Sequence, residues 1–341
     1  STTDAALEFG QIAADELYRD YLRRHRKDPS EERAKLRNFL SKIVETAFRG
    51  PLDDATRKLY IDDQIASVED DGEAIKRVAL IALKSPRFLY PLLDSERPKS
   101  QRVANRLALT LCDSLTADDW LGRAEEKTQL EQEQQVLNAA RRMVNDYRTE
   151  AKTRSFLYQW VEVNDSEEII KDESNYPGFD AELVQELRRS FDTFLSDVPW
   201  SESREFRQVR QSDWSSTTRP LQIFYGDAWR QADEEKTGLQ RSVSDPVAHV
   251  GAITHPLLMS SLAYHKTTSP IHRGVFLTRH TLGRVLRPPN AAFTPLNPDL
   301  HPGLTTRERV ELQTGEVSCQ VCHEKINGLG FALEQFDATG R

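Results

Sequence analysis

Residues 36–51 read LRNFLSKIVETAFRGP. Apolar side chains recur in this stretch every three or four positions, which is the spacing of one face of an α-helix. The members of that face are Leu36, Phe39, Leu40, Ile43, Val44, Ala47 and Phe48. Gly50-Pro51 follows directly and is typical of a helix end, because proline cannot continue the helical hydrogen bonds. The stretch therefore predicts an amphipathic helix that buries one side.

The same spacing recurs along most of the chain. We expect further helices over residues 75–83, 103–115, 136–147, 183–195, 254–265, 273–286 and 305–314. In the 254–265 helix, Thr254 is a candidate N-cap, and Pro256 falls in the first turn, where its missing N–H does no harm. No long stretch alternates between apolar and polar residues, as a half-buried strand would. The predicted fold class is therefore all-α, with a multi-helical body.

Two segments depart from the helical pattern. Residues 230–246 are polar and short of apolar anchors, which predicts a loop or a connector. Residues 287–303, RPPNAAFTPLNPDLHPG, are rich in proline and predict an extended wrap over another part of the protein. We accordingly divide the chain into an N-terminal helical domain (1–94), a second helical domain (95–228) and a C-terminal module (229–341) that contains the wrap.

Composition indicates a soluble globular protein and excludes some partners. Of the 341 residues, 38% are hydrophobic and 29% are charged, and the net charge is −8. Because binding to phosphate groups needs a basic surface, this charge argues against nucleic acid as a partner. The longest wholly apolar run, residues 78–83, has six residues. A transmembrane helix needs roughly 20, so we expect no transmembrane segment.

Two of the three cysteines stand beside a histidine near the end of the chain. Cys319, Cys322 and His323 form C-x-x-C-H, the attachment motif of c-type haem. On one helical turn, each thiol can add to one vinyl group of the same porphyrin, and His323 then lies under the ring with a nitrogen aimed at the iron. The motif predicts one covalent haem c, with His323 as the proximal ligand.

The haem motif also predicts a compartment. Attachment of haem to C-x-x-C-H takes place outside the cytoplasm, so we expect a periplasmic or extracellular protein. The first residues, STTDAALEFG, lack the basic end and apolar stretch of a signal peptide. We therefore expect that a signal peptide has been removed.

Other uses of the cysteines are weaker. A structural zinc site needs four ligands, and the sequence has no second C-x-x-C to supply the remaining ones. A redox-active C-x-x-C would normally begin a helix in a thioredoxin-like βαβ setting, which the helical pattern does not offer. Cys112 falls on an apolar helical face, which predicts a buried free thiol. Met143 also lies on an apolar stripe and is predicted to pack in a core.

The chemistry of the iron would depend on the group opposite His323, since a protein ligand favours electron transfer and an open position permits peroxide or oxygen chemistry. Seven of the eight histidines lie between residues 249 and 323. We rank His255 first, His265 second and Met259 third as the sixth ligand. The other candidates in this segment are His249, His272, His280 and His301.

Haem propionates are anions and need charge-assisted donors. Arg273 and Arg284 are the predicted partners, and Arg279 and Arg287 are further candidates. Solvated surface arginines are the alternative interpretation.

The C-terminal segment resembles the cytochrome-c-like module of large secreted proteins that are abundant in planctomycetes and consist of consecutive domains of unknown function. The resemblance rests on Cys319-Gln-Val-Cys322-His323, Ile326, Leu329-Gly330-Phe331-Ala332-Leu333-Glu334, Phe336-Asp337 and Gly340-Arg341. Upstream, it extends to Gly251 to Pro256, Thr268-Ser269-Pro270, Arg273-Gly274, Leu282-Gly283, Pro288-Pro289, Tyr225-Gly226, Gln159-Trp160, Arg106-Leu107, Ser85 to Tyr90 and Ala47 to Leu52. It thus covers nearly the whole chain and implies a secreted haem protein.

Two departures from the family pattern stand out. The family usually has Asp-Pro where this chain has Asn327-Gly328, so the proline packed near the proximal imidazole is absent. The family also continues past Gly340-Arg341 with another domain, which implies that this chain is a fragment or a trimmed product.

Together these features predict an extracytoplasmic mono-haem c-type cytochrome module that passes single electrons to a redox partner protein, such as an oxidative enzyme. Association with other surface or periplasmic proteins fits the same setting. Two alternatives stay open. One is a haem peroxidase or oxidase with an exchangeable sixth ligand, and the other is a cell-surface structural protein in which the haem only staples the tail.

Overall fold

A computed structural model describes the chain except for residues 28–29, 94, 116–118, 164–167, 202–204, 227–228, 232–237, 245–248 and 287–300. The chain forms two compact units, Ser1–Lys152 and Thr153–Arg341. About 64% of the residues are helical and 3% lie in strands, so the structure confirms a mostly helical protein. The predicted division into three domains is a finer statement than these two units and stays a prediction.

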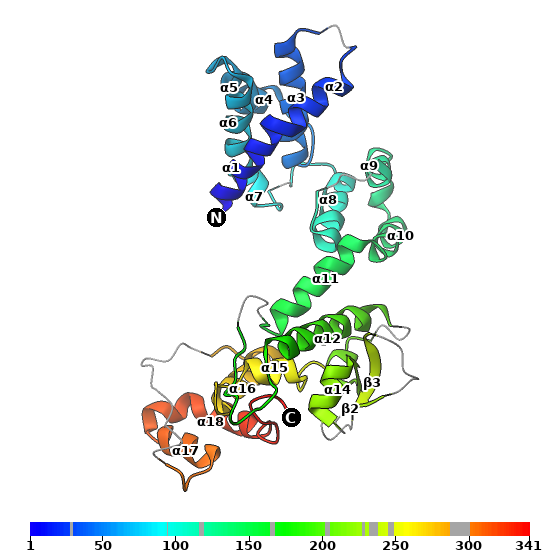
Figure 1. Cartoon of the computed structure of the whole chain (residues 1–341). Coiled ribbons are helices and arrows are strands. Elements are labelled where there is room, and N and C mark those ends of the chain that lie inside the picture. The colour runs from blue at the N-terminus through cyan, green and yellow to red at the C-terminus, as the bar shows by residue number, and fades with distance from the viewer. Residues whose placement is uncertain are drawn as a thin grey trace. The chain divides into compact units, whose positions relative to one another are not determined.

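The first unit consists of helices (Figure 1). They are α1 (Thr2–Ile12), the π-helical η1 (Ala13–Leu17), α2 (Tyr18–Arg24), α3 (Glu32–Ala47), α4 (Asp54–Arg57), the π-helical η2 (Lys58–Asp62), α5 (Asp63–Ala66), α6 (Asp71–Leu83), α7 (Pro86–Leu89), α8 (Lys99–Cys112), α9 (Asp119–Glu126), the 3₁₀ turn η3 (Gln129–Glu131) and α10 (Glu133–Val144). The next helix, α11 (Tyr147–Trp160), contains the boundary between the units.

The apolar faces read from the sequence form the cores of this unit. Leu36, Leu40 and Val44 of α3 are fully buried and share a cluster with Ile75 and Val78 of α6. A second cluster joins α8 and α10 and contains Cys112 and Met143. Cys112 is a buried free thiol and Met143 is core packing, as the sequence predicts.

The second unit contains the longest helix and a small sheet. Its elements are α12 (Ala181–Trp200), α13 (Gln208–Gln211), β1 (Trp214–Thr217), α14 (Arg219–Tyr225), β2 (Trp229–Gln231), β3 (Gln240–Ser244), α15 (Pro256–Ser261), α16 (Pro270–Phe276), the π-helical η5 (Leu277–Thr281), α17 (Thr306–Gln313) and α18 (Val317–Phe331). Its core includes Leu187, Phe191 and Phe194 of α12.

The sheet corrects the prediction that residues 230–246 form a loop. Three antiparallel strands pair in the order β1-β3-β2, and β2 and β3 lie partly or wholly in that segment. The strands have three to five residues each, and every residue of β1 is buried. Alternation is therefore absent from β1, and the other strands are too short for alternation to be recognised. The rest of the predicted loop lies mostly outside the described residues.

Two helix predictions near the C-terminus have the wrong bounds. The predicted 254–265 helix is the shorter α15, and His255 rather than Thr254 is its N-cap. The predicted 273–286 helix begins earlier, at Pro270, where the Ser269 side chain accepts a hydrogen bond from the His272 N–H. The predicted wrap over 287–303 lies almost wholly outside the described residues.

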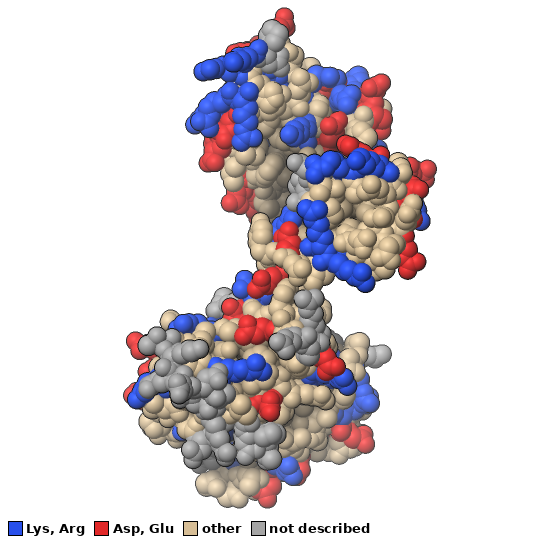
Figure 2. Space-filling model, turned by 90° about the vertical axis from the view of Figure 1, so that its right-hand side faces the viewer, with Lys and Arg blue, Asp and Glu red and all other residues tan. Residues whose placement is uncertain are grey.

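Charged residues of both signs share the surface. Figure 2 shows Lys and Arg beside Asp and Glu on the visible face of each unit, and local ion pairs such as Arg33–Asp71 (2.8 Å) reflect this mixing. None of the described helices combines the length and apolar character that crossing a bilayer requires.

Candidate functional site

The three residues of the C-x-x-C-H motif lie on α18, a helix of 15 residues that the sequence pattern did not predict beyond the one turn at the motif. On this helix, Cys322 and His323 lie three and four positions after Cys319, so the three side chains share one face. All three are half-buried, and both thiols are free. The arrangement therefore presents two reduced, reachable sulfur atoms and an imidazole side by side on one helical surface.

The same face of α18 continues into a tight helix crossing. Ile326 and Gly330 lie three and seven positions beyond His323 and are buried. α16 and α18 lie side by side (Figure 1), and their backbones approach closely at two glycines. A Cβ atom on Gly274 would lie 2.1 Å from the Ile326 carbonyl oxygen, and one on Gly330 would lie 1.9 Å from that of Pro270. This packing fixes the helix that carries the motif.

A chain of hydrogen bonds orients the His323 imidazole. Its Nδ1 lies 3.0 Å from Asn327 Oδ1, and Asn327 Nδ2 donates to Thr314 Oγ1 at 3.0 Å. The Thr314 hydroxyl donates to the Val310 carbonyl at 2.8 Å. Because an amide oxygen can only accept, Nδ1 carries the proton and donates. In this tautomer Nε2 has the lone pair that a metal needs.

His255, the first-ranked sixth ligand, is in a different environment. It is 2% exposed and packs against the rings of Phe191 and Trp229. Its Nδ1 accepts from the Leu257 N–H at 3.2 Å, and its Nε2 lies 3.2 Å from Ser190 Oγ. Because Nδ1 accepts a hydrogen bond, Nε2 is the protonated nitrogen. Both ring nitrogens are therefore engaged in hydrogen bonds inside the core. Burial, followed by the nearby His249, lowers the pKa of His255 to about 3.

The other two candidates for the sixth ligand are placed apart from each other. Met259 is fully buried in the core cluster of the second unit. His265 is largely exposed, and its Nδ1 lies 3.3 Å from the Ile170 carbonyl oxygen. His255 and Met259 are buried and His265 is largely exposed, so the three side chains do not share one environment, and the sixth ligand stays a prediction.

The two predicted propionate partners also differ. Arg273 is fully buried, and its guanidinium donates to the carbonyl oxygens of Leu333, Phe336 and Asp337 at 2.7–2.8 Å. It also pairs with Glu334 at 3.1 Å. These bonds tie α16 to the turn that follows α18. Arg284 is exposed, and Arg287 lies outside the described residues. Contact of any of them with a haem stays a prediction.

Sequence reasoning missed two polar residues of this unit. In the sequence, Asn327 stands out only as a departure from a family pattern, and Lys171 belongs to none of the motifs described above. The Lys171 ammonium donates to the carbonyl oxygens of Ser260, Ala263 and Tyr264 at 2.9–3.0 Å, at the end of α15. Burial lowers the pKa of Lys171 to about 8. No local sequence signal marks Lys171, because its partners come from other elements. Asn327 could have been found from its position four residues after His323 on one helix, but its second partner, Thr314, lies outside α18.

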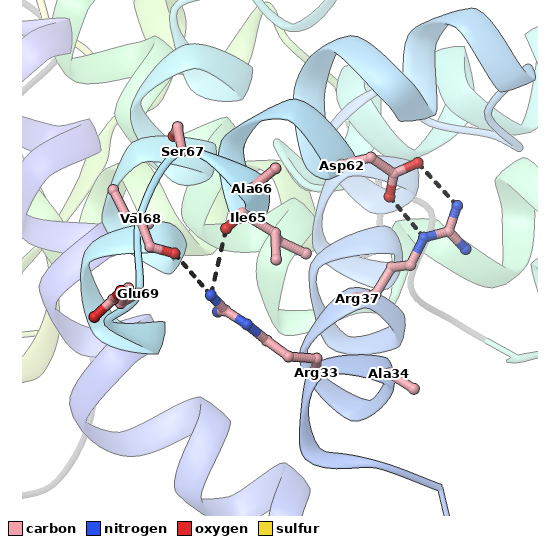
Figure 3. A pocket seen from close by; sticks show the side chains of 9 residues that line it. All are labelled: Arg33, Ala34, Arg37, Asp62, Ile65, Ala66, Ser67, Val68 and Glu69. Carbon is pink, nitrogen blue, oxygen red and sulfur yellow. Dashed lines mark hydrogen bonds and ion pairs between the residues drawn. The ribbon is translucent and has the colours of Figure 1, made fainter.

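The first unit contains an open groove of about 650 Å³, lined by α3 on one side and by residues 62–69, from the end of η2 through α5, on the other. Figure 3 shows the Arg33 side chain directed at the carbonyl oxygens of Ile65 and Val68, and Arg37 paired with both oxygens of Asp62. These arginines hold the helices together.

Among the described residues, no group of three or more His, Cys, Asp or Glu side chains is placed to hold a metal ion.

Comparison with known families adds a further observation. Residues 99–226 match the family PSD4, described as a protein of unknown function (DUF1592). Residues 249–341 match the family PSCyt3, also described as a protein of unknown function (DUF1588). The segment that matches PSD4 thus precedes the segment that matches PSCyt3. This order fits the multi-domain, planctomycete cytochrome-like proteins that the sequence resembles.

The PSCyt3 match includes α15 to α18 and therefore the whole Cys-His face. The PSD4 match begins at α8 and extends through α14, so it crosses the boundary between the two compact units. Searches of curated proteins and of solved structures found no match.

Proposed function

We propose that the PSCyt3 segment is an extracytoplasmic, mono-haem c-type cytochrome module that exchanges single electrons with a redox partner protein. The observation that carries this proposal is the shared face of α18, on which two free thiols lie beside an imidazole whose Nδ1–H is already donated. The name of the matching family, PSCyt3, hints at the same cytochrome-like nature.

The residues of this face fit the chemistry of a c-type haem. Each thiol adds across one vinyl C=C bond, so that a C–S bond forms and the hydrogen goes to the other vinyl carbon, without any oxidant. Cys319 and Cys322 are free and half-buried, as this addition requires. The His323 tautomer provides an Nε2 lone pair for the iron. The bound haem would supply a one-electron couple, and α18, held against α16, would keep its attachment points rigid.

A redox titration of the haem-loaded protein tests electron transfer. We expect one reversible one-electron wave per chain. An iron centre that cannot be cycled between its two oxidation states would overturn the proposed function.

A second candidate function is peroxide or oxygen chemistry at an exchangeable sixth position. It is favoured by the engagement of His255 and Met259 in the core, which removes two of the three ranked ligands from easy reach. Cyanide binding to the oxidised protein separates the two. Rapid, tight binding supports the second candidate, and resistance to cyanide supports electron transfer with a protein ligand in the sixth position.

A further inference from the structure

We propose that Asn327 is a positioning residue that sets the orientation and the electron-donating strength of the His323 imidazole, a role that rests on the proposed haem function. Asn327 lies four positions after His323 on α18, so the two side chains are neighbours on the helix surface. The 3.0 Å contact joins His323 Nδ1 to Asn327 Oδ1. The hydrogen-bond acceptor at His323 Nδ1 is therefore a side chain, which a substitution can change.

Thr314 determines which end of the Asn327 amide faces the imidazole. The Thr314 side chain is 4% exposed, and its hydroxyl proton is donated to the Val310 carbonyl at the end of α17. Its oxygen is therefore an acceptor for Asn327 Nδ2. With the NH₂ group held on that side, Oδ1 points to His323, and every bond in the chain has one direction.

This hydrogen bond has a predictable electronic effect. An imidazole that donates its Nδ1–H to an oxygen is a stronger base at Nε2, as is known for ligating histidines held by a second layer of polar groups. A stronger donor favours the oxidised state of the metal that it binds. Asn327 should therefore lower the reduction potential relative to a variant without an acceptor, and a carboxylate in its place should lower the potential further.

The experiment compares Asn327→Leu, Asn327→Asp and the unchanged chain after haem loading, each with its reduction potential measured. We expect the potential to rise in Asn327→Leu and to fall in Asn327→Asp. Thr314→Val, which frees the amide to turn, should raise the potential by less than Asn327→Leu does. Asn138→Leu is the matched control, because this exposed amide accepts a hydrogen bond from the side chain four positions earlier, Gln134 Nε2 at 3.1 Å, on α10 of the first unit; the potential should not change.

Nitrogen NMR of His323 in the haem-free chain gives a second readout. We expect the Nδ1–H tautomer in the unchanged chain and a mixture of tautomers in Asn327→Leu. If haem attaches normally but the potentials do not follow the order Leu, Asn, Asp, or if Nε2–H dominates in the haem-free chain, the positioning role is wrong and the haem function stands. If no variant, including the unchanged chain, takes up covalent haem, both proposals fail.

Discussion

His255 and His323 belong to the same unit, but their imidazole rings differ in burial and in hydrogen bonding. At His255, the Leu257 N–H and the Ser190 hydroxyl take one ring nitrogen each, and aromatic rings enclose the side chain. At His323, the hydrogen bond to Asn327 fixes the proton on Nδ1 of a half-buried ring beside two thiols. Hydrogen bonding and burial thus make His255 a structural histidine, whereas His323 follows the C-x-x-C pair and has one fixed tautomer.

Removing the two thiols should have the largest effect on this contrast. In the double variant Cys319→Ala, Cys322→Ala we expect complete loss of covalent haem, because no sulfur is left for the vinyl groups. Folding should persist, since both side chains are only half-buried. The matched control is Cys112→Ala, which should keep its haem and lose some stability in the first unit. Mass spectrometry of the intact chains measures the attachment, and retention of haem by the double variant would contradict the account.

Acid should act on the His255 region. In the unfolded chain the imidazole has a pKa of 6.5, and in the folded protein the pKa of His255 is about 3. Between these values the unfolded chain binds more protons, so the stabilising contribution is complete above pH 6.5 and is lost as the pH falls toward 3. The linked loss of unfolding free energy is about 5 kcal/mol. Burial also lowers the pKa of His249, which acts in the same direction.

Denaturant titrations at several pH values, followed by tryptophan fluorescence, can measure this loss, since four of the five tryptophans lie in the second unit. The raised pKa of Glu334 opposes the trend, so His255→Asn serves as the reference. Asparagine can still cap α15 but does not titrate. The pH dependence should be shallower in this variant, and identical slopes would argue against a buried neutral His255.

Truncation of each histidine to alanine should lower the free energy of unfolding by different amounts. His255→Ala removes the cap of α15 and the partner of the Ser190 hydroxyl inside the core, and we expect a loss of about 3 kcal/mol in unfolding free energy. His323→Ala removes a half-buried side chain, and in the haem-free chain we expect a loss of about 1 kcal/mol or less. Similar losses of unfolding free energy in both variants would mean that the two histidines contribute equally to the fold, contrary to this expectation.

The helix crossing that supports α18 offers a smaller, local test. Gly330→Ala places a methyl group against the Pro270 carbonyl, and we expect a loss of about 2 kcal/mol from the forced separation of α16 and α18. Gly328→Ala is the control on the same helix, since a Cβ there has no atom within 4 Å. It should stabilise α18 by up to about 1 kcal/mol. Thermal unfolding of the two variants should therefore shift in opposite directions.

Much of the fold could be predicted from the sequence where local periodicity and packing agree. The 36–48 and 75–83 faces became the buried faces of α3 and α6 because a stripe of apolar residues on a helix has few other ways to leave water. The small sheet could not be predicted, since its strands are short and β1 is buried along its whole length. Its pairing depends on residues distant in the sequence.

The candidate site divides in the same way. The Cys319, Cys322 and His323 face follows from spacing alone once α18 is a helix. The roles of His255 and Arg273 and the direction of the Asn327 amide depend on partners from other elements, namely Ser190, the turn at Leu333 to Asp337, and Thr314. Tertiary contacts of this kind leave no pattern in the local sequence. A ranking of sixth ligands by helical spacing therefore could not take them into account.

A haemochrome assay on the purified protein, produced in cells with an intact apparatus for attaching c-type haem, shows directly whether α18 carries a covalent haem. We expect one haem per chain, which stays with the polypeptide through acid and organic extraction and gives the absorption spectrum of a haem with two thioether bonds. A colourless chain of unmodified mass, or a haem that washes away, would contradict it.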